Sequence, residues 1–308
     1  MVHSVRDLVS RVVEDRLRRD LFYLSSNPLR FRKVNYTVPG HSVCSLEETD
    51  AYLTEQLGTL GYEVTRRPYR VRPFRCDESK PLHHWYSVPA ADDPWYTAHN
   101  IEAEIKGAET PEEILVLVSH KDSMSWIDSP GAHDNCTGTV ANLEIARVLA
   151  DASPRRTIRF LFCNEEHTPW TSRFAAEEAI ERGDRIIAVM NQDSLAGKSD
   201  AQRARGALAH AVCYSTDEGR ELAERIAAVN AAEEIGLELD VVHKKHVNDD
   251  DGMFIKAGYR RTVMNVGSFP YADSEYHLVG DVPERVDLEN LVRSTRLVLA
   301  SVLHLDQD

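Results

Sequence analysis

Four short apolar runs, each nearly continuous, stand out along the chain. They are ILVLVS (114–119), TIRFLFC (157–163), RIIAVMN (185–191) and RRTVMNV (260–266). Apolar runs of this length that do not alternate with polar residues predict strands covered on both faces, as in a parallel or mixed sheet between helices. Two earlier segments, YEVTRRPYRV (62–71) and HNIEAEIKG (99–107), predict further strands.

Helical spacing of apolar residues fills much of the chain between these runs. The predicted helices cover about residues 4–24, 45–61, 141–149, 215–236 and 288–299. The capping boxes SLEE (45–48) and STDE (215–218) are expected to open two of them, because their side chains can satisfy free backbone N–H groups. Asp287 is expected to cap the last helix.

Strands that alternate with helices predict an α/β fold, here a three-layer α/β/α sandwich around a mixed, mostly parallel sheet. The chain has 308 residues, of which 42% are hydrophobic, so it can bury a substantial core. Residues 74–98, rich in Pro, His and Trp, interrupt the pattern. We therefore expect one domain over residues 1–308, with a loop insertion at about 74–98.

Composition narrows the class of protein. The net charge of −14 argues against nucleic acid or an anionic membrane as a partner, because both attract basic surfaces. Five scattered cysteines without a CxxC pair are typical of free thiols in a reducing compartment. The N-terminal segment is charged and lacks the apolar core of a secretion signal, and no apolar stretch is long enough for a membrane span. We expect a cytoplasmic protein without a membrane partner.

Three of the predicted strands are followed immediately by residues that can bind metals. They are His120 and Asp122 after the first run, Glu165 and Glu166 after the second, and Asp193 after the third. The carboxyl ends of strands in an open α/β sheet surround its ligand crevice, so these side chains are expected to meet at one edge. Asp134 lies just before a predicted helix, and His277 lies in the segment SEYHLVGD.

Each of these residues, taken singly, has an ordinary explanation as a loop histidine, a solvated glutamate pair or a helix cap. Their coincidence at the ends of buried strands favours a metal site. Two histidines with several carboxylates suit zinc, and manganese or cobalt could also bind. One Asp between two ions, with the histidines, a Glu and a second Asp as outer ligands, would form a two-metal site with ions about 3.5–4 Å apart.

The order and spacing of these motifs resemble the co-catalytic zinc aminopeptidases of clan MH, a family that also contains glutamate-carboxypeptidase-like and glutaminyl-cyclase-like members. The matching motifs are HKDS (120–123), PGAHDNCTG (130–138), NEE (164–166), NQD (191–193) and YH (276–277). The resemblance runs from about Leu21 to the C-terminus. It implies the zinc-exopeptidase, phosphorylase/hydrolase-like form of the α/β sandwich.

The resemblance also implies the metal ligands. His120 and Asp193 would hold one Zn²⁺ ion, and Glu166 and His277 would hold the other. Asp134 would bridge the two ions, so that its carboxylate offsets their mutual repulsion.

Three further roles follow from the same resemblance. Asp122 would hydrogen-bond the ring of His120 and fix its tautomer. Glu165 would be the general base, taking a proton from the attacking water and returning it to the leaving amine. Tyr276 would steady the tetrahedral intermediate. Glu165 and Glu166 would therefore have different functions although they are adjacent.

Some residues depart from the family pattern. Lys121 and His133 are unusual neighbours of the ligands, and HTPWTS (167–172) stands where a glycine-rich turn is common. In the segment 248–254, Asp251 occupies the place of a histidine. These departures are expected to affect substrate specificity rather than metal binding.

The predicted function is that of a two-zinc aminopeptidase acting on peptide or aminoacyl substrates. The alternatives are a single-zinc glutaminyl-cyclase-like acyltransferase and a non-catalytic binding relative. A serine hydrolase is disfavoured because no G-x-S-x-G motif is present. LAGKSD (195–200) lacks the first glycine of a phosphate-binding loop. The histidines at 83, 84, 243 and 246 have no carboxylate frame around them in the sequence and are predicted to lie on the surface.

Overall fold

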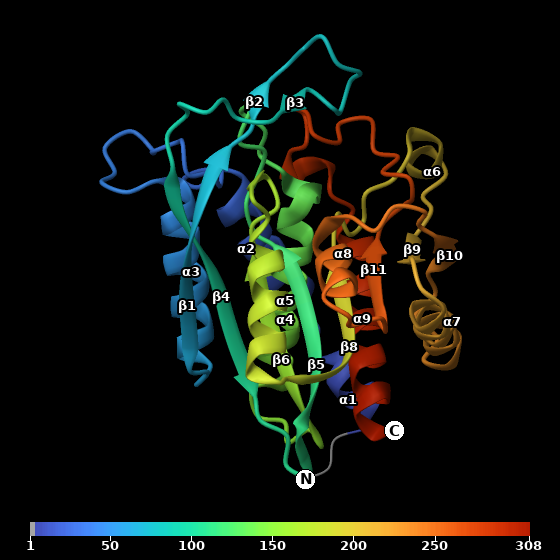
Figure 1. Ribbon diagram of the computed structural model, residues 1–308. Coiled ribbons are helices and arrows are strands. Elements are labelled where there is room, and N and C mark those ends of the chain that lie inside the picture. The colour runs from blue at the N-terminus through green and yellow to red at the C-terminus, as the bar shows by residue number, and fades with distance from the viewer. Residues whose placement is uncertain (1–3) are drawn as a thin grey trace.

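A computed structural model describes residues 4–308, and a nine-stranded mixed sheet runs through its centre (Figure 1). The strands lie in the spatial order β10 (Glu238–His243), β9 (Ala209–Tyr214), β11 (Thr262–Val266), β8 (Arg185–Gln192), β5 (Thr110–His120), β6 (Arg156–Cys163), β4 (Tyr96–Ile105), β1 (Val64–Pro73) and β7 (His167–Thr168). The four central strands β11, β8, β5 and β6 pair in parallel. Antiparallel pairs join β9 to β11 on one side and β6 to β4, β4 to β1 and β1 to β7 on the other.

The four apolar runs form the four central strands, as predicted. Side chains of β5 show why these runs do not alternate with polar residues. Leu115 and Leu117 pack into the larger hydrophobic core, whereas Val116 and Val118 pack into a smaller core on the opposite face. Because both faces are covered, every position from 114 to 118 of the strand is apolar.

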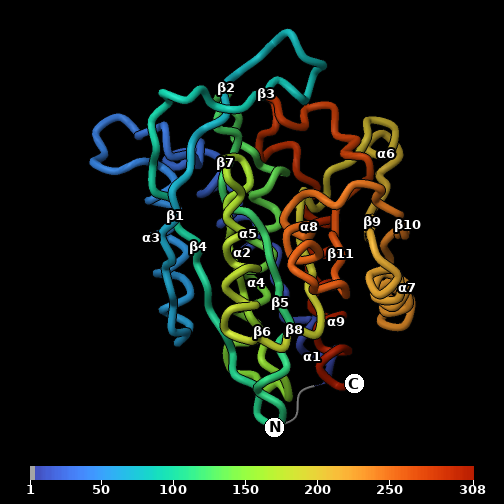
Figure 2. Tube along the Cα trace, viewed as in Figure 1, coloured from blue at the N-terminus to red at the C-terminus, as the bar shows by residue number. Residues whose placement is uncertain are grey.

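Helices cover both faces of the sheet, which confirms the predicted three-layer sandwich. The larger core contains residues of α1 (Val5–Ser10), α2 (Glu14–Ser25), α3 (Ser45–Thr59), α4 (Gly138–Leu149), α7 (Asp217–Ala232) and α9 (Leu288–Gln307). The smaller core contains residues of α5 (Thr171–Arg182) and α8 (Asp249–Lys256), which lie in front of the sheet in Figure 2. Asp287 caps α9 as predicted, accepting a hydrogen bond from the backbone N–H of Asn290 at 3.1 Å.

The helix predicted over residues 4–24 is interrupted and forms α1 and α2. Val13 has an extended backbone between them, and its N–H donates to Oε1 of Glu144 at 2.9 Å. The buried Glu144 belongs to α4, so a contact between distant parts of the chain decides this break.

Neither predicted capping box forms. Ser45 is the first residue of α3 rather than its cap, and its hydroxyl bonds the backbone of Lys33 instead. In α7 the cap is Thr216, one residue after Ser215, and its hydroxyl accepts from the N–H of Gly219 at 3.0 Å. Both helices begin close to the predicted positions, but the capping hydrogen bonds that the local sequence predicts do not form.

Residues 74–98 connect β1 to β4 and contain the short antiparallel pair β2 (Arg75–Cys76) and β3 (Tyr86–Ser87). In Figure 1 this hairpin projects beyond the end of the sheet at which β1 and β5 finish. The predicted insertion is therefore partly ordered as a hairpin above the carboxyl ends of the central strands. Within residues 4–308, no helix is both long enough and apolar enough to cross a membrane.

Candidate metal centre

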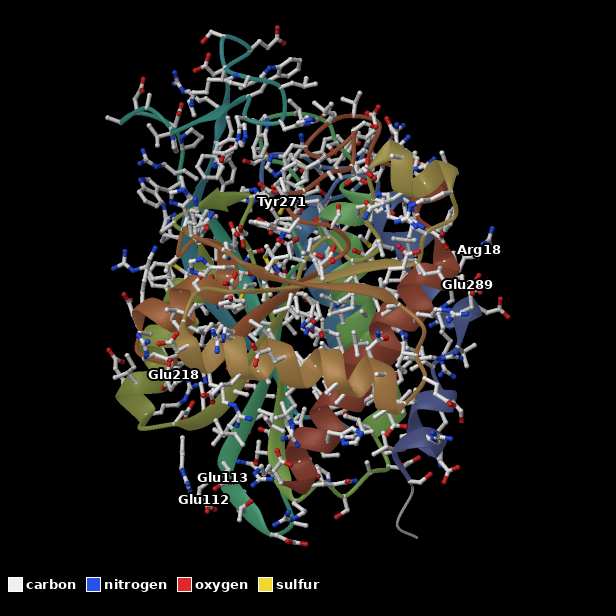
Figure 3. The ribbon with its side chains drawn as sticks, turned by 90° about the vertical axis from the view of Figure 1, so that its right-hand side faces the viewer. Arg18, Glu112, Glu113, Glu218, Tyr271 and Glu289 are labelled. Atoms are coloured by element: carbon white, nitrogen blue, oxygen red, sulfur yellow. The ribbon has the colours of Figure 1, made fainter. Side chains whose placement is uncertain are left out.

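All five predicted metal ligands lie together at the carboxyl ends of the central strands. His120 ends β5, Glu166 and Asp193 follow β6 and β8, Asp134 lies in the irregular turn before α4, and His277 lies in the loop after β11. Figure 3 shows Tyr271, from the same loop as His277, in the upper part of the molecule, whereas Glu112 and Glu113 in the first half of β5 lie near its lower end.

Two possible ligand groups share the carboxylate of Asp134. Its Oδ1 lies 3.0 Å from Nε2 of His120, and its Oδ2 lies 3.1 Å from Nε2 of His277. Asp193 Oδ1 is 3.6 Å from His120 Nε2, and Glu166 Oε1 is 3.3 Å from His277 Nε2. Within each group the ligand atoms lie within 4.8 Å of one another. One carboxylate thus faces two separate sets of ligands, as a bridging carboxylate must.

The charge of this site fits divalent cations. Asp134, Asp193 and Glu166 are buried, which is costly for uncompensated carboxylates. Burial raises the pKa of Glu166 to about 7, against the opposing charge of His277. Burial disfavours a charge on His277 as well, yet the Glu166 and Asp134 carboxylates raise its pKa to about 10. Two bound dications would neutralise the carboxylates, and nitrogen and oxygen ligands suit zinc.

Asp122 connects more of the site than the sequence predicted. Its Oδ1 lies 3.2 Å from Nδ1 of His120, the predicted contact, and also accepts from the backbone N–H of Glu165 at 2.9 Å. Its Oδ2 accepts from the N–H of Glu166 at 2.8 Å and lies 2.7 Å from Nδ1 of His167. Burial would raise the pKa of Asp122, but its hydrogen bonds with the two histidines hold that pKa well below its ordinary value.

Glu165 differs from its neighbour Glu166 in its surroundings. Both residues line the central pocket, whose volume is about 70 Å³. Glu165 is the more exposed of the two, and its Oε2 accepts from the backbone N–H of Asp250 at the start of α8, at 2.9 Å. Burial and the carboxylates of Asp250 and Asp249 raise the pKa of Glu165 well above its ordinary value. A carboxylate that holds a proton readily is suited to general acid–base catalysis.

Tyr276 lines the same pocket, where it is stacked between two rings. Its ring centroid lies 3.9 Å from that of His277 and 4.5 Å from that of Tyr271. The hydroxyl of Tyr271 donates to Oδ2 of Asp193 at 2.5 Å. Sequence reasoning missed Tyr271, because its position six residues before His277 carries no metal-ligand signal. Only the folded loop places it against a ligand.

Aromatic residues form the walls of the pocket. Phe74 and Tyr86 come from the hairpin, and Trp170 comes from the segment that replaces the glycine-rich turn. The same three residues also line an adjoining hollow of about 290 Å³, which extends to Met253 of α8. Asn248 and Asp249 complete the central pocket. The segments that depart from the family pattern thus line the pocket at the candidate metal centre.

The unusual neighbours of the ligands are paired within the protein. Lys121 is fully buried, and its Nζ lies 2.9 Å from Asp50 and 2.6 Å from Oδ1 of Asn164. His133 contacts the carboxylate of Asp281 through its backbone N–H at 2.8 Å and through Nδ1 at 2.9 Å. Neither residue lines the central pocket.

A third group of possible ligands, Glu47, Asp50 and His99, lies outside this site. Arg66 is 2.7 Å from Glu47, and Lys121 is 2.9 Å from Asp50. These two cations already neutralise the carboxylates, so the group needs no metal ion. Of the four histidines predicted to be surface residues, those at 84, 243 and 246 are exposed. His83 is half-buried against residues 267–282, the loop that carries His277 and is called the ligand loop below.

Comparison with known proteins places the chain among metallopeptidases. The family model described as peptidase family M28 matches residues 100–302. A probable zinc metalloprotease of Pyrenophora teres f. teres is 26% identical over 253 residues, covering 68% of this chain and 52% of that protein. A probable aminopeptidase of Saccharomyces cerevisiae is 22% identical over 230 residues, covering 70% and 59% respectively. The chain thus spans about half the length of these curated relatives.

Solved structures share the fold at low sequence identity. An aminopeptidase from Aneurinibacillus sp. strain AM-1 has a TM-score of 0.75 and 14% identity, with 97% of this chain and 95% of that chain covered. A glutaminyl cyclase from Bacteroides thetaiotaomicron has a TM-score of 0.71 and 16% identity, with coverage of 95% and 98%. The resemblance drawn from the sequence motifs is confirmed by the family match, and the predicted fold class by these structures.

Proposed function

The chain belongs to peptidase family M28, and we propose that it is a zinc-dependent aminopeptidase that removes the N-terminal residue of peptide or aminoacyl substrates. Relatives that are named zinc metalloprotease and aminopeptidase support this proposal. The strongest structural support is Asp134, because its two carboxylate oxygens face His120 and His277 separately.

Two Zn²⁺ ions are the proposed cofactors. His120 and Asp193 would hold one ion, Glu166 and His277 the other, and Asp134 both. When bound, the ions supply Lewis acidity, which acidifies a water molecule and polarises the carbonyl group of the substrate. The charge of the site supports this number of ions, since the three buried ligand carboxylates carry a charge of −3, which a single Zn²⁺ ion would offset only in part.

Glu165 is the proposed general base. It accepts a proton from the attacking water and donates that proton to the leaving amine. Its raised pKa suits both steps, since a carboxylate of ordinary pKa is a weaker base and holds the proton too briefly to act as an acid. The N–H of Asp250 donates to this carboxylate, and the backbone N–H groups of residues 165 and 166 donate to Asp122, so that these hydrogen bonds keep Glu165 in place.

Tyr276 is proposed to contact the substrate in the transition state, as its place in the pocket allows. Its ring is fixed by stacking on Tyr271 and His277. Asp122 acts through His120 and through the backbone of the Glu pair, so we assign it a positioning role.

The function can be tested on one purified sample, with metal content and turnover measured together on aminoacyl nitroanilides and short peptides. We expect release of the N-terminal residue, loss of this activity after treatment with a strong chelator, and recovery when zinc is added. Full activity in protein shown to be metal-free would overturn the proposal.

A single-zinc glutaminyl-cyclase-like reaction is the alternative, and the fold similarity to the Bacteroides enzyme favours including it. An N-terminal glutamine peptide added to the same assay distinguishes the two reactions. Ammonia release without peptide cleavage, at one zinc per chain, would support the cyclase. A non-catalytic binding relative would turn over neither substrate.

We also propose a cytoplasmic location without nucleic-acid or membrane partners. All five cysteines are free thiols, which suits a reducing compartment. The net charge of −14 disfavours contact with polyanions.

A further inference from the structure

We infer that the hairpin at residues 74–98 supports the metal centre, because His83 near its tip positions the metal ligand His277. This inference rests on the proposed zinc site. It assigns a role to a segment that lies outside the residues matched by the family model, which begin at residue 100.

Two hydrogen bonds join the hairpin to the ligand loop in opposite directions. Nδ1 of His277 lies 2.7 Å from the backbone carbonyl of His83, and Nδ1 of His83 lies 2.6 Å from the backbone carbonyl of Tyr276. A carbonyl can only accept, so both imidazoles carry their proton on Nδ1. Nε2 of His277 is then the atom with a free lone pair, and it points at Asp134 and Glu166. The carbonyl of His83 thus selects the tautomer that can bind a metal.

The backbone at both partners needs such support. His83 has a φ of 74° and His277 has a φ of 59°, in the left-handed region that side chains other than glycine rarely adopt. A residue holds this conformation only where its surroundings fix it. The paired hydrogen bonds between these two residues and their neighbours provide that constraint on both sides.

The hairpin is itself well anchored, so it can support another element. Its strands β2 and β3 pair directly, and the N–H of Asp77 donates to the carbonyl of Trp85 at 2.6 Å. At its base, Tyr86 lies against Trp126, with ring centroids 4.9 Å apart. Both rings also lie edge-on to His277, at 5.9 and 5.1 Å between centroids. The imidazole of His277 is held by an aromatic wall as well as by its hydrogen bond.

The other half of the site is supported differently. Nδ1 of His120 contacts Asp122, two residues along the same chain segment, and no hydrogen bond links the described residues of the hairpin to His120. A change at His83 should therefore weaken the Glu166–His277 half of the site and spare the His120–Asp193 half. This asymmetry distinguishes a positioning role from a general effect on folding.

The test is His83→Gly, compared with His83→Asn and with His84→Gly as the matched control. Glycine accepts a φ of 74° without strain, so the first variant removes the hydrogen bond from the ring while leaving the backbone conformation accessible. Asparagine tolerates left-handed φ and carries an N–H donor. His84 is the exposed neighbour in the same hairpin, and no hydrogen bond of its side chain reaches the described ligand loop.

Zinc dissociation constants are measured for each variant by competition with a chromophoric chelator. His83→Gly keeps the carbonyl that contacts His277 but removes the ring hydrogen bond to Tyr276 that holds this carbonyl in place. Its effect should therefore lie at the lower end of the about 10–100-fold in affinity that loss of an outer hydrogen-bond partner of a metal ligand typically costs. We expect His83→Gly to weaken one of the two zinc sites about 10-fold and leave the other unchanged. His83→Asn should recover most of the loss, and His84→Gly should match the wild type. In a His277→Ala background, His83→Gly should have no further effect.

Equal zinc affinities in His83→Gly and the wild type would overturn the inference. So would an equal loss at both zinc sites, because His83 would then serve the fold in general. Thermal unfolding of the metal-free variants checks that the fold is retained. A wild-type protein that binds no zinc would overturn the proposed function together with the inference, whereas two zinc ions bound normally by His83→Gly would overturn the inference alone.

Discussion

The hydroxyl of Tyr271 donates a hydrogen bond to Oδ2 of Asp193 at 2.5 Å, while Oδ1 of the same carboxylate faces Nε2 of His120 at 3.6 Å. Oδ2 of Asp193 is thereby held by Tyr271, whereas Oδ1, which faces His120, accepts only a longer hydrogen bond from the hydroxyl of Ser194 at 3.2 Å. Tyr271 thus orients a ligand in one half of the site, as His83 does in the other.

Tyr271→Phe removes this hydrogen bond and keeps the ring that stacks on Tyr276. We expect the affinity for zinc at the His120–Asp193 position to fall by about 10-fold, in line with other lost outer partners of metal ligands. Competition titration with a chelator measures the effect. Tyr259→Phe is the matched control, since its hydroxyl donates to the backbone carbonyl of Asp184 instead. Equal affinities in both variants would show that Tyr271 does not support the ligand.

Changing each of the two adjacent glutamates to glutamine should have different effects on metal content and turnover. Glu165→Gln keeps its shape but loses the ability to accept a proton, so both metals should stay while turnover falls by about 100–10,000-fold. Glu166→Gln weakens a metal ligand, so occupancy should drop and excess zinc should restore part of the activity. Metal content and kcat for both variants decide between these roles. Metal loss confined to Glu165→Gln would mean that the two roles are reversed.

Asp134 and His277 should differ in how many ions depend on them. Asp134 faces both histidines, so Asp134→Ala should deplete both metals. His277→Ala should deplete chiefly the ion shared with Glu166. Metal stoichiometry after dialysis against a weak chelator measures both outcomes. Two tightly held ions in Asp134→Ala would be incompatible with a bridging carboxylate.

His210, a buried histidine away from the candidate metal centre, should make the folded state less stable at acidic pH. Burial lowers the pKa of His210 to about 4, although its Nε2 lies 3.2 Å from Oδ1 of Asn265. In the unfolded chain the pKa of His210 returns to about 6.5, so between these values the unfolded state binds a proton that the folded state does not. Stability must therefore fall as the pH drops below about 6.5, by about 1.4 kcal/mol per pH unit until the folded pKa is reached.

Urea unfolding of metal-free protein at pH 7.5 and pH 5.5 tests this expectation, with His210→Gln as the comparison. The wild type should lose about 1.4 kcal/mol more than the variant between these two pH values. Working without metal removes the competition between protons and zinc, and the titration of the ligands themselves cancels in the comparison with the variant. The same pH dependence in both proteins would show that His210 does not titrate as described.

Local sequence was sufficient to predict the strands at the centre of the sheet. The runs that form β5, β6, β8 and β11 are mostly apolar and do not alternate with polar residues, a pattern set by burial on both faces. Local sequence did not predict β9 and β10. β10 has no fully buried residue, so its sequence carries little hydrophobic signal, and its pairing with β9 depends on the neighbouring strand.

The residue types of the proposed metal ligands and their places after the strands could also be read from the sequence. Parallel strands bring their carboxyl ends to one edge, so residues that follow them must meet there. This reasoning predicts that His120, Asp193 and Glu166 lie together, and the order of the motifs adds Asp134 and His277.

Only the tertiary structure decided how these ligands are held. Asp122 bonds the backbone at 165 and 166, Tyr271 bonds Asp193, and the carbonyl of His83 bonds a histidine 194 positions away in the chain. Such partners carry no sequence signal, because a backbone carbonyl or a loop tyrosine occurs anywhere. A single hydrogen bond is short and directional, so it forms only after the packed sheet and the hairpin have fixed both of its ends in space.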